Sequence, residues 1–158
     1  MRNKDQILLE SLYERILKEN YYEHDDSPIA WESGDYRIVL NDPTGKNNNI
    51  ATLLHREFVN GREYWARRGR LITDKATKKI DGKLINYAKV YVVDIEKAHR
   101  GKGLGKQLYR SLLENLPEDV VGIGSNTESR SNKKVIPKLY KKLNAKSYND
   151  GMFELILK

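Results

Sequence analysis

The sequence predicts an α+β fold: a mixed, mostly antiparallel, twisted sheet flanked by helices, with one helix at the N-terminus. Three observations carry this prediction. Residues 4–20 have apolar side chains at helical spacing, the middle of the chain has two hairpin signals, and the second half alternates between strand-like and helix-like segments. The length of 158 residues suits one hydrophobic core, so we expect a single domain over residues 1–158.

The first elements are expected to be helices. Leu8 and Leu12 begin an apolar rail along residues 4–20, as in an amphipathic helix. Ser27 and Pro28 have the signature of a helix start, because serine caps a helix and proline fits its first turn. We therefore expect a short second helix after Ser27.

Strands are expected to fill the middle of the chain. Asn60-Gly61 is the dipeptide most typical of a tight hairpin turn, and Asp81-Gly82 marks a second hairpin. Segments rich in β-branched and aromatic residues flank these turns. The strands predicted here cover residues 36–40, 50–59, 62–72 and 84–95.

The last part of the chain is expected to alternate between helices and strands. Leucines recur every four residues from Leu104, which predicts a helix that ends before Pro117. Pro137 fits only the first turn of a helix, so the next helix is expected to begin near Lys134. The predicted elements are a helix over residues 104–116, a strand over 120–124, a helix over 134–143, and closing strands over 147–148 and 152–157.

The most informative segment is the basic, glycine-rich turn Arg100–Gly105, between the strand over 84–95 and the helix that follows. Free N–H groups at a helix N-terminus, the positive end of the helix dipole and nearby cations together favour phosphate oxygens. No P-loop motif is present, and the third glycine comes one residue too early for the dinucleotide-binding motif Gly-x-Gly-x-x-Gly. The turn therefore predicts a phosphate-bearing ligand of another kind.

Two segments resemble a known family. Arg100, Gly103 and Gly105 fit the pattern Arg/Gln-x-x-Gly-x-Gly/Ala, and Leu139-Tyr140 is followed by Lys-Lys-Leu-Asn-Ala-Lys. They resemble the acyl-CoA loop and the Leu-Tyr-x-x-Leu-Gly-Phe segment of the GCN5-related N-acetyltransferase (GNAT) superfamily. The resemblance implies the GNAT fold, in which two central strands splay apart, and a single acetyltransferase domain. It also implies acetyl-CoA as the acyl-donor substrate.

The resemblance is specific over residues 84–158 and looser before them. The family has a strand before its first helix, whereas this chain is expected to begin with the helix. Either that strand is missing, or the loop after Leu40 replaces the family's usual pair of helices. In the second segment, Asn144 and Ala145 stand where the family has glycine and phenylalanine.

The resemblance also implies which residues meet the cofactor. The backbone of Val93, Asp94 and Ile95 would pair with the pantetheine arm like an added strand, with an N–H group facing the thioester carbonyl. Asn132 resembles an asparagine that holds the pantetheine, although it lies one residue farther from Tyr140 than in the family pattern. The residues around the diphosphate would be Arg100, Gly101, Lys102, Gly103, Leu104, Gly105 and Lys106.

For the chemistry, Tyr140 resembles the tyrosine that protonates the departing thiolate. Its hydroxyl can donate a proton at neutral pH. The general base stays open between Glu96, beside the cofactor strand, and Glu128, after the strand over 120–124. The chain has no cysteine to carry an acyl group, so we expect direct transfer in a ternary complex.

Composition limits the remaining possibilities. The net charge of +7 suits the phosphates of CoA, a nucleic acid, or a solvated basic surface. Without cysteine there are no disulfides or thiolate metal sites, and His24 and His55 are far apart in sequence, so no metal is expected. No apolar run approaches the length of a membrane helix and no apolar leader follows Met1, so we expect no membrane span and a cytoplasmic location.

We therefore expect an acetyl-CoA-dependent N-acyltransferase acting on a primary amine. A protein amine, a polyamine, an aminoglycoside and an aminoacyl-tRNA all remain open as acceptors, and so does the oligomeric state. The alternative is a non-catalytic basic module of the same fold that binds nucleic acid or a protein partner. It would use Arg62, Arg67, Arg68, Arg70, Lys133, Lys134, Lys138, Lys141 and Lys142.

Overall fold

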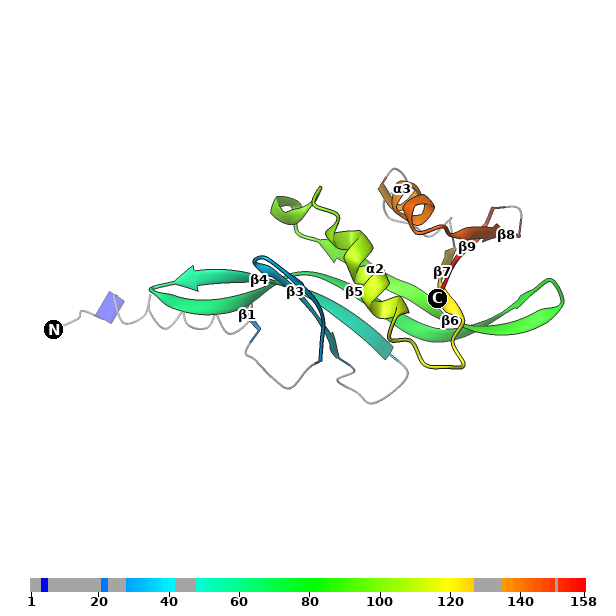
Figure 1. The fold of residues 1–158 in the computed structure, drawn as a ribbon, viewed down its shortest axis with the longest axis horizontal. Coiled ribbons are helices and arrows are strands. Elements are labelled where there is room, and N and C mark those ends of the chain that lie inside the picture. The colour runs from blue at the N-terminus through cyan, green and yellow to red at the C-terminus, as the bar shows by residue number, and fades with distance from the viewer. Residues whose placement is uncertain (1–3, 6–20, 23–27, 42–47, 127–134, 150) are drawn as a thin grey trace.

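The fold is built around one large sheet with helices packed on it (Figure 1). The structure is a computed structural model, and it describes residues 4–5, 21–22, 28–41, 48–126, 135–149 and 151–158. The strands are β1 (Tyr21–Tyr22), β2 (Ile29–Ser33), β3 (Tyr36–Asn41), β4 (Asn48–Val59), β5 (Arg62–Ile80), β6 (Lys83–Ile95), β7 (Gly122–Asn126), β8 (Lys146–Tyr148) and β9 (Phe153–Leu157). The helices are the 3₁₀ turn η1 (Lys97–His99), α2 (Leu104–Leu113) and α3 (Val135–Lys142).

The order of strands in the sheet is β2-β3-β4-β5-β6-β7-β9-β8, and β1 pairs with β5 off this path. Among the strands that the structure describes, only β6 and β7 run parallel, and helix α2 makes the crossover between them. All other pairs are antiparallel. The predicted α+β class and mostly antiparallel sheet are therefore confirmed.

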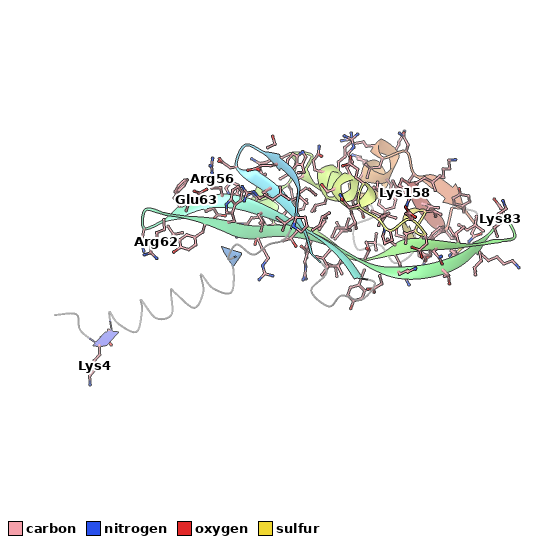
Figure 2. The ribbon with its side chains drawn as sticks, turned by 60° about the horizontal axis from the view of Figure 1, so that its bottom comes forward. Lys4, Arg56, Arg62, Glu63, Lys83 and Lys158 are labelled. Carbon is pink, nitrogen blue, oxygen red and sulfur yellow. The ribbon has the colours of Figure 1, made fainter. Side chains whose placement is uncertain are left out.

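Both predicted hairpins are present. Asn60 and Gly61 have positive φ angles of 51° and 77°, the left-handed conformation that a tight hairpin turn requires. Asp81 and Gly82 do the same at the other turn, with φ angles of 49° and 79°. The tips of the two hairpins project from opposite ends of the molecule, as Arg62 and Lys83 mark in Figure 2.

The short helix expected after Ser27 is wrong, because β2 occupies that position. Gly34, with φ of 58°, allows a tight turn into β3, and the two strands then pair. Pro28 lies just before β2, and its carbonyl accepts a hydrogen bond from the Leu40 N–H at 2.9 Å. Since β2 is an edge strand, the missing N–H of a flanking proline removes no sheet hydrogen bond. Ser27 lies outside the described residues.

The N-terminal helix predicted over residues 4–20 is described only at Lys4 and Asp5, which are helical. Its remainder lies outside the described residues. Between β3 and β4 the connection is residues 42–47 alone, shorter than a pair of helices requires. The region before Tyr21, where the strand that precedes the family's first helix would lie, is outside the described residues apart from Lys4 and Asp5.

Helix α2 packs its apolar face on the sheet. Leu104, Leu108 and Leu112 are buried in one cluster with Leu53 and Leu71 of the sheet. The helix ends at Leu113, earlier than predicted, because the Asn115 side chain caps the Ser111 carbonyl at 2.8 Å and Pro117 follows. Of the helices in the described residues, none combines the length and the apolar character that a bilayer crossing demands.

Candidate functional site

Strands β6 and β7 pair over a short stretch and then part. Their paired positions are Ala88 with Ile123 and Lys89 with Gly124. Next along β6, the pairing with β5 shifts register and leaves Tyr91 as an extra, exposed residue. Such a bulge bends a strand and increases its twist. We call the part of β6 and β7 beyond these pairs the fork.

The β6 side of the fork is an open backbone edge. The Glu96 N–H donates to the Arg68 carbonyl of β5 at 2.8 Å. Because successive N–H groups of a strand point in opposite directions, the Ile95 N–H faces away from β5, into the fork. Val93 and Ile95 are half-buried with their side chains packed against the main core. Asp94 is exposed, with its carboxylate 3.4 Å from Arg70 Nε.

The β7 side contributes a buried hydroxyl. Ser125 follows Gly124, the last β7 residue paired with β6, and is 8% exposed. Its Oγ has no hydrogen-bond partner in the described part of the chain. A buried hydroxyl without a partner is unfavourable, and native proteins retain few of them. The β7 strand therefore carries a buried hydroxyl one residue beyond its last pair with β6.

The predicted phosphate-binding turn lies where β6 ends. Gly101 and Gly103 have φ angles of 77° and 75°, and Gly103 is the N-cap of α2. A Cβ added at either glycine would meet no atom within 4 Å. The turn thus has left-handed backbone that favours glycine and open space in front of it.

The backbone N–H groups of this turn are unsatisfied. In the residues that the structure describes, no hydrogen bond starts at the N–H groups of Gly101 through Lys106, whereas the Gln107 N–H donates to the Gly103 carbonyl at 3.3 Å. The first turn of α2 has no acidic residue, and Lys102 is exposed beside it. Orphan N–H groups at the positive end of a helix dipole form an anion-binding site.

Arg100 ties this turn to the sheet. Its Nε donates to the Ile95 carbonyl at 2.7 Å, and the side chain is exposed. Gly105 brings three elements together: a Cβ there would lie 3.6 Å from Leu139 of α3 and 3.7 Å from Ile95 of β6. Leu104 is buried under the turn. The segment predicted to hold the diphosphate is therefore held to β6 by Arg100 at its start and packed against β6 and α3 at Gly105.

Tyr140 lies in the core between α2 and α3. It is 1% exposed, and its hydroxyl is 3.2 Å from that of Tyr109 in α2. The two rings meet edge to face, with centroids 5.5 Å apart. Sequence reasoning missed Tyr109, although it directly follows Leu108 on the buried face of the helix. The acid role of Tyr140 stays a prediction.

Of the two candidate bases, only Glu96 lies within the described residues. The carboxylate of Glu96 is bound by Arg68 at 2.9 Å and is 54% exposed. Glu128, Asn132, Lys133 and Lys134 lie outside the described residues.

Next to Glu96 lies a polar cluster formed by Tyr36, His55, Glu57, Arg68 and His99, which the sequence analysis did not predict. The Tyr36 hydroxyl is 2.7 Å from His99 Nδ1, and the His99 and His55 rings lie 4.8 Å apart between centroids. His55 Nδ1 is 3.2 Å from the Glu57 carboxylate. The only sequence signals were the alternation of His55 and Glu57 along one strand face and the place of His99 directly before Arg100. No group of three metal-ligating side chains occurs in the part of the chain that the structure describes.

Burial and neighbouring charges shift the pKa values of two side chains in the cluster, His99 and Glu57. Burial lowers the pKa of His99 from its ordinary 6.5, and the nearby His55 and Arg68 lower it further, against the opposing charges of Glu57 and Glu96. The hydrogen bond from Arg68 lowers the pKa of Glu57 from its ordinary 4.5. Both shifts favour the forms present at neutral pH, with His99 neutral and Glu57 charged.

We expect the free energy of unfolding to fall as the pH is lowered below 6.5. A lowered pKa in the folded state means that the unfolded chain binds more protons, so stability is lost as the pH falls through that window. Glu57 extends the loss below 4.5. Urea denaturation from about pH 7.5 to pH 5 measures the effect. His99→Gln should flatten the curve above pH 5, and an unchanged curve in that variant would exclude His99 as its source.

Some of the basic residues that a non-catalytic binding module would use are already paired with carboxylates. Arg68 is paired with two carboxylates and Arg70 with Asp94. The helix α3 presents exposed lysines at Lys138, Lys141 and Lys142. The arginines of β5 therefore do not form one free cationic stripe.

Comparisons with known proteins support the fold. No protein-family model matches the sequence, and no curated protein matches it. Among solved structures, the chain is similar to an AtaT mutant toxin bound to the C-terminus of the antitoxin AtaR, with a TM-score of 0.55, 12% identity, and 77% of this chain and 92% of that chain covered.

Two further structures are similar. Arabidopsis thaliana NAA60 in complex with a bisubstrate analogue gives a TM-score of 0.53 at 11% identity, over 72% of this chain and 78% of that chain. The KacTA–DNA complex gives 0.51 at 14% identity, over 70% and 68%. The chain thus has a GNAT-like fold, as the sequence resemblance predicted.

Proposed function

We propose that the protein is an acetyl-CoA-dependent N-acyltransferase that moves the acetyl group directly from the thioester to a primary amine. One observation carries the proposal: the orphan N–H groups of Gly101–Lys106 lie at the end of the open β6 edge. A ligand with a diphosphate and an extended amide-bearing arm satisfies both sets of groups together. CoA has both parts, and the basic turn suits its phosphates.

The proposed cofactor contacts follow from this placement. The diphosphate lies against Gly101, Lys102, Gly103, Leu104, Gly105 and Lys106, with Arg100 beside it. The pantetheine pairs with the backbone of Val93, Asp94 and Ile95, and Asn132 is proposed to hold it as well. The Ile95 N–H donates to the thioester carbonyl and stabilises the charge that develops on its oxygen.

The transfer needs one base and one acid. The neutral amine attacks the thioester carbonyl carbon, a C–N bond forms, the C–S bond breaks, and CoA leaves as a thiolate. A carboxylate, Glu96 or Glu128, takes the proton that the amine loses, directly or through water. Tyr140 gives its proton to the sulfur. Tyr109 shares a hydrogen bond with Tyr140 and fixes the direction of its hydroxyl.

The acceptor is proposed only as a primary amine. A protein amine, a small polyamine or aminoglycoside, and an aminoacyl-tRNA all carry one. The similar structures were solved with a bisubstrate analogue, with DNA and with an antitoxin segment, so they do not point to one acceptor.

Calorimetry with acetyl-CoA tests the proposal, followed by a thiol-release assay over a panel of amines. We expect saturable acetyl-CoA binding and thiol release with at least one amine. A folded protein that binds nucleic acid but not acetyl-CoA would overturn the enzyme and favour the binding module.

Replacing Arg100 by alanine should weaken CoA binding by on the order of 1.5–3 kcal/mol, the range for a charge-assisted hydrogen bond. The loss should shrink at high salt, since the side chain is exposed. Arg110→Ala is the matched control, because it removes the same charge from the far end of α2. An equal loss for CoA and dephospho-CoA places Arg100 on the diphosphate, and a loss for CoA alone places it on the ribose phosphate. Unchanged affinity for both ligands contradicts its role.

A further inference from the structure

We infer that Arg68 is a positioning residue for the phosphate-binding turn. Through Glu57 and Glu96 it holds the residue that follows β6, and a second set of contacts through Tyr36 and His99 fixes η1. Together these contacts determine where the orphan N–H groups of the turn lie. The inference rests on the proposed function, since it concerns how the same turn meets acyl-CoA.

The position of Arg68 on the sheet is unusual. In the pairing of β4 with β5, Leu53 lies opposite Gly69 and Leu54 opposite Arg67, so Arg68 is an extra residue. A bulge of this kind re-aims a side chain. Gly69 follows, and a Cβ there would lie 2.9 Å from the Asp94 carbonyl. The backbone of β5 therefore approaches the end of β6 as closely as only glycine permits.

Arg68 joins two carboxylates from different segments. Its Nε and Nη2 donate to the two oxygens of Glu57 at 2.8 and 2.7 Å, and its Nη1 donates to Glu96 at 2.9 Å. The Arg68 and Glu57 side chains are only 20% and 24% exposed, so solvent screens this bidentate pair less than a surface pair. With the backbone bond from the Glu96 N–H to the Arg68 carbonyl, the first residue after β6 is held by main chain and side chain together.

The other end of the same segment is held from β3 and β4. His99 contacts the Tyr36 hydroxyl and lies against the His55 ring, while His55 is in turn bound to Glu57. Glu57 thus contacts both Arg68 and His55. One connected set of side chains therefore spans β3, β4, β5 and η1.

The residues held by this cluster lead directly into the turn. Arg100 follows His99, and its Nε bond to the Ile95 carbonyl closes the segment back onto β6. Gly101 then begins the left-handed backbone. Because several N–H groups must face one diphosphate, the affinity depends on the turn being held in place before the ligand arrives. A loosened cluster should weaken contacts to the phosphates and spare contacts to the pantetheine.

Two variants test this inference. Arg68→Gln combined with Glu57→Gln removes both charges of the half-buried pair together and leaves two amide side chains that can donate to and accept from each other. Tyr36→Phe removes only the hydroxyl that contacts His99. Arg56→Gln is the matched control, because Arg56, on the projecting β4–β5 hairpin (Figure 2), also contacts two carboxylates, Glu63 of the same hairpin and Asp35 of the β2–β3 turn.

The readouts are the affinity for acetyl-CoA by calorimetry and for S-acetylpantetheine by NMR titration. In the Arg68/Glu57 variant we expect acetyl-CoA affinity to fall by about tenfold or more with S-acetylpantetheine affinity unchanged, since the shorter donor lacks the phosphates. Tyr36→Phe should also lower the affinity for acetyl-CoA, but by a smaller factor. Unchanged acetyl-CoA affinity in the folded variants, or an equal loss for both donors, would overturn the inference.

Backbone NMR relaxation of residues 97–103 in the ligand-free protein separates this inference from the proposed function. We expect the variants, but not Arg56→Gln, to show increased fast motion there. If the wild-type protein does not bind acetyl-CoA, the proposed function fails while the relaxation result still decides the role of Arg68. Unchanged relaxation in the variants counts against the positioning role whatever the ligand.

Discussion

Replacing Gly103 by glutamate is expected to abolish acetyl-CoA binding and to leave the domain folded. The added side chain occupies the open space in front of the turn, where no atom lies within 4 Å of a Cβ. Its charge repels the diphosphate at the point where the orphan N–H groups would bind it. The positive φ of 75° adds strain of about 1–2 kcal/mol, which a domain of ordinary stability tolerates.

Gly82→Glu is the matched control for this variant. Gly82 has nearly the same φ, 79°, and an added Cβ also meets nothing within 4 Å. It lies at the tip of the β5–β6 hairpin, next to Lys83 (Figure 2). Both variants should show a similar fall in melting temperature, and only Gly103→Glu should lose the calorimetric signal for acetyl-CoA. Wild-type affinity in folded Gly103→Glu would remove the turn from the cofactor site.

Replacing Tyr140 by phenylalanine is expected to lower the turnover number by roughly a hundredfold or more, the range for losing a general acid. The ring and its edge-to-face contact with Tyr109 remain, so the loss of stability should be limited to the hydrogen bonds of the hydroxyl, about 1 kcal/mol each. Acetyl-CoA affinity should stay close to that of the wild type. The measurement is single-turnover thiol release, with the amine found in the acceptor panel.

Tyr109→Phe distinguishes an acid from a buried aromatic pair. It removes the other hydroxyl of the same pair and leaves the Tyr140 hydroxyl in place. If Tyr140 is the acid, Tyr109→Phe should lower the turnover number much less than Tyr140→Phe does, because it removes only a group that orients the acid. Equal losses in the two variants would mean that the pair orients another donor, and near-normal turnover in Tyr140→Phe would reject the acid role.

Local signals predicted most of the elements. Asn60-Gly61 and Asp81-Gly82 fixed the three long strands because each dipeptide favours the left-handed turn that it forms. The leucine spacing of α2 needs no knowledge of its neighbours. The helix expected after Ser27 was wrong because pairing between β2 and β3 outweighed a local capping signal.

No local sequence pattern could predict the polar cluster. His55 and His99 meet only because two hairpins set the register of β4, β5 and β6 and because a bulge turns Arg68 toward Glu57. A bulge shifts register by one residue, and sequence periodicity does not show where it falls. The cofactor turn was predictable because its glycines, cations and helix start are consecutive in sequence.

Strand β6 pairs along most of its length with β5 but over a short stretch with β7, and this difference affects how the chain folds and opens. On one side, β4, β5 and β6 form a meander of sequence neighbours, whereas on the other side β6 and β7 share two paired positions in the described residues. Local contacts form early and non-local parallel pairing forms late. We therefore expect two cooperative units with their boundary at the fork, which separate there first under native conditions. A bound acyl-CoA would join these units and so slow the opening of the whole domain.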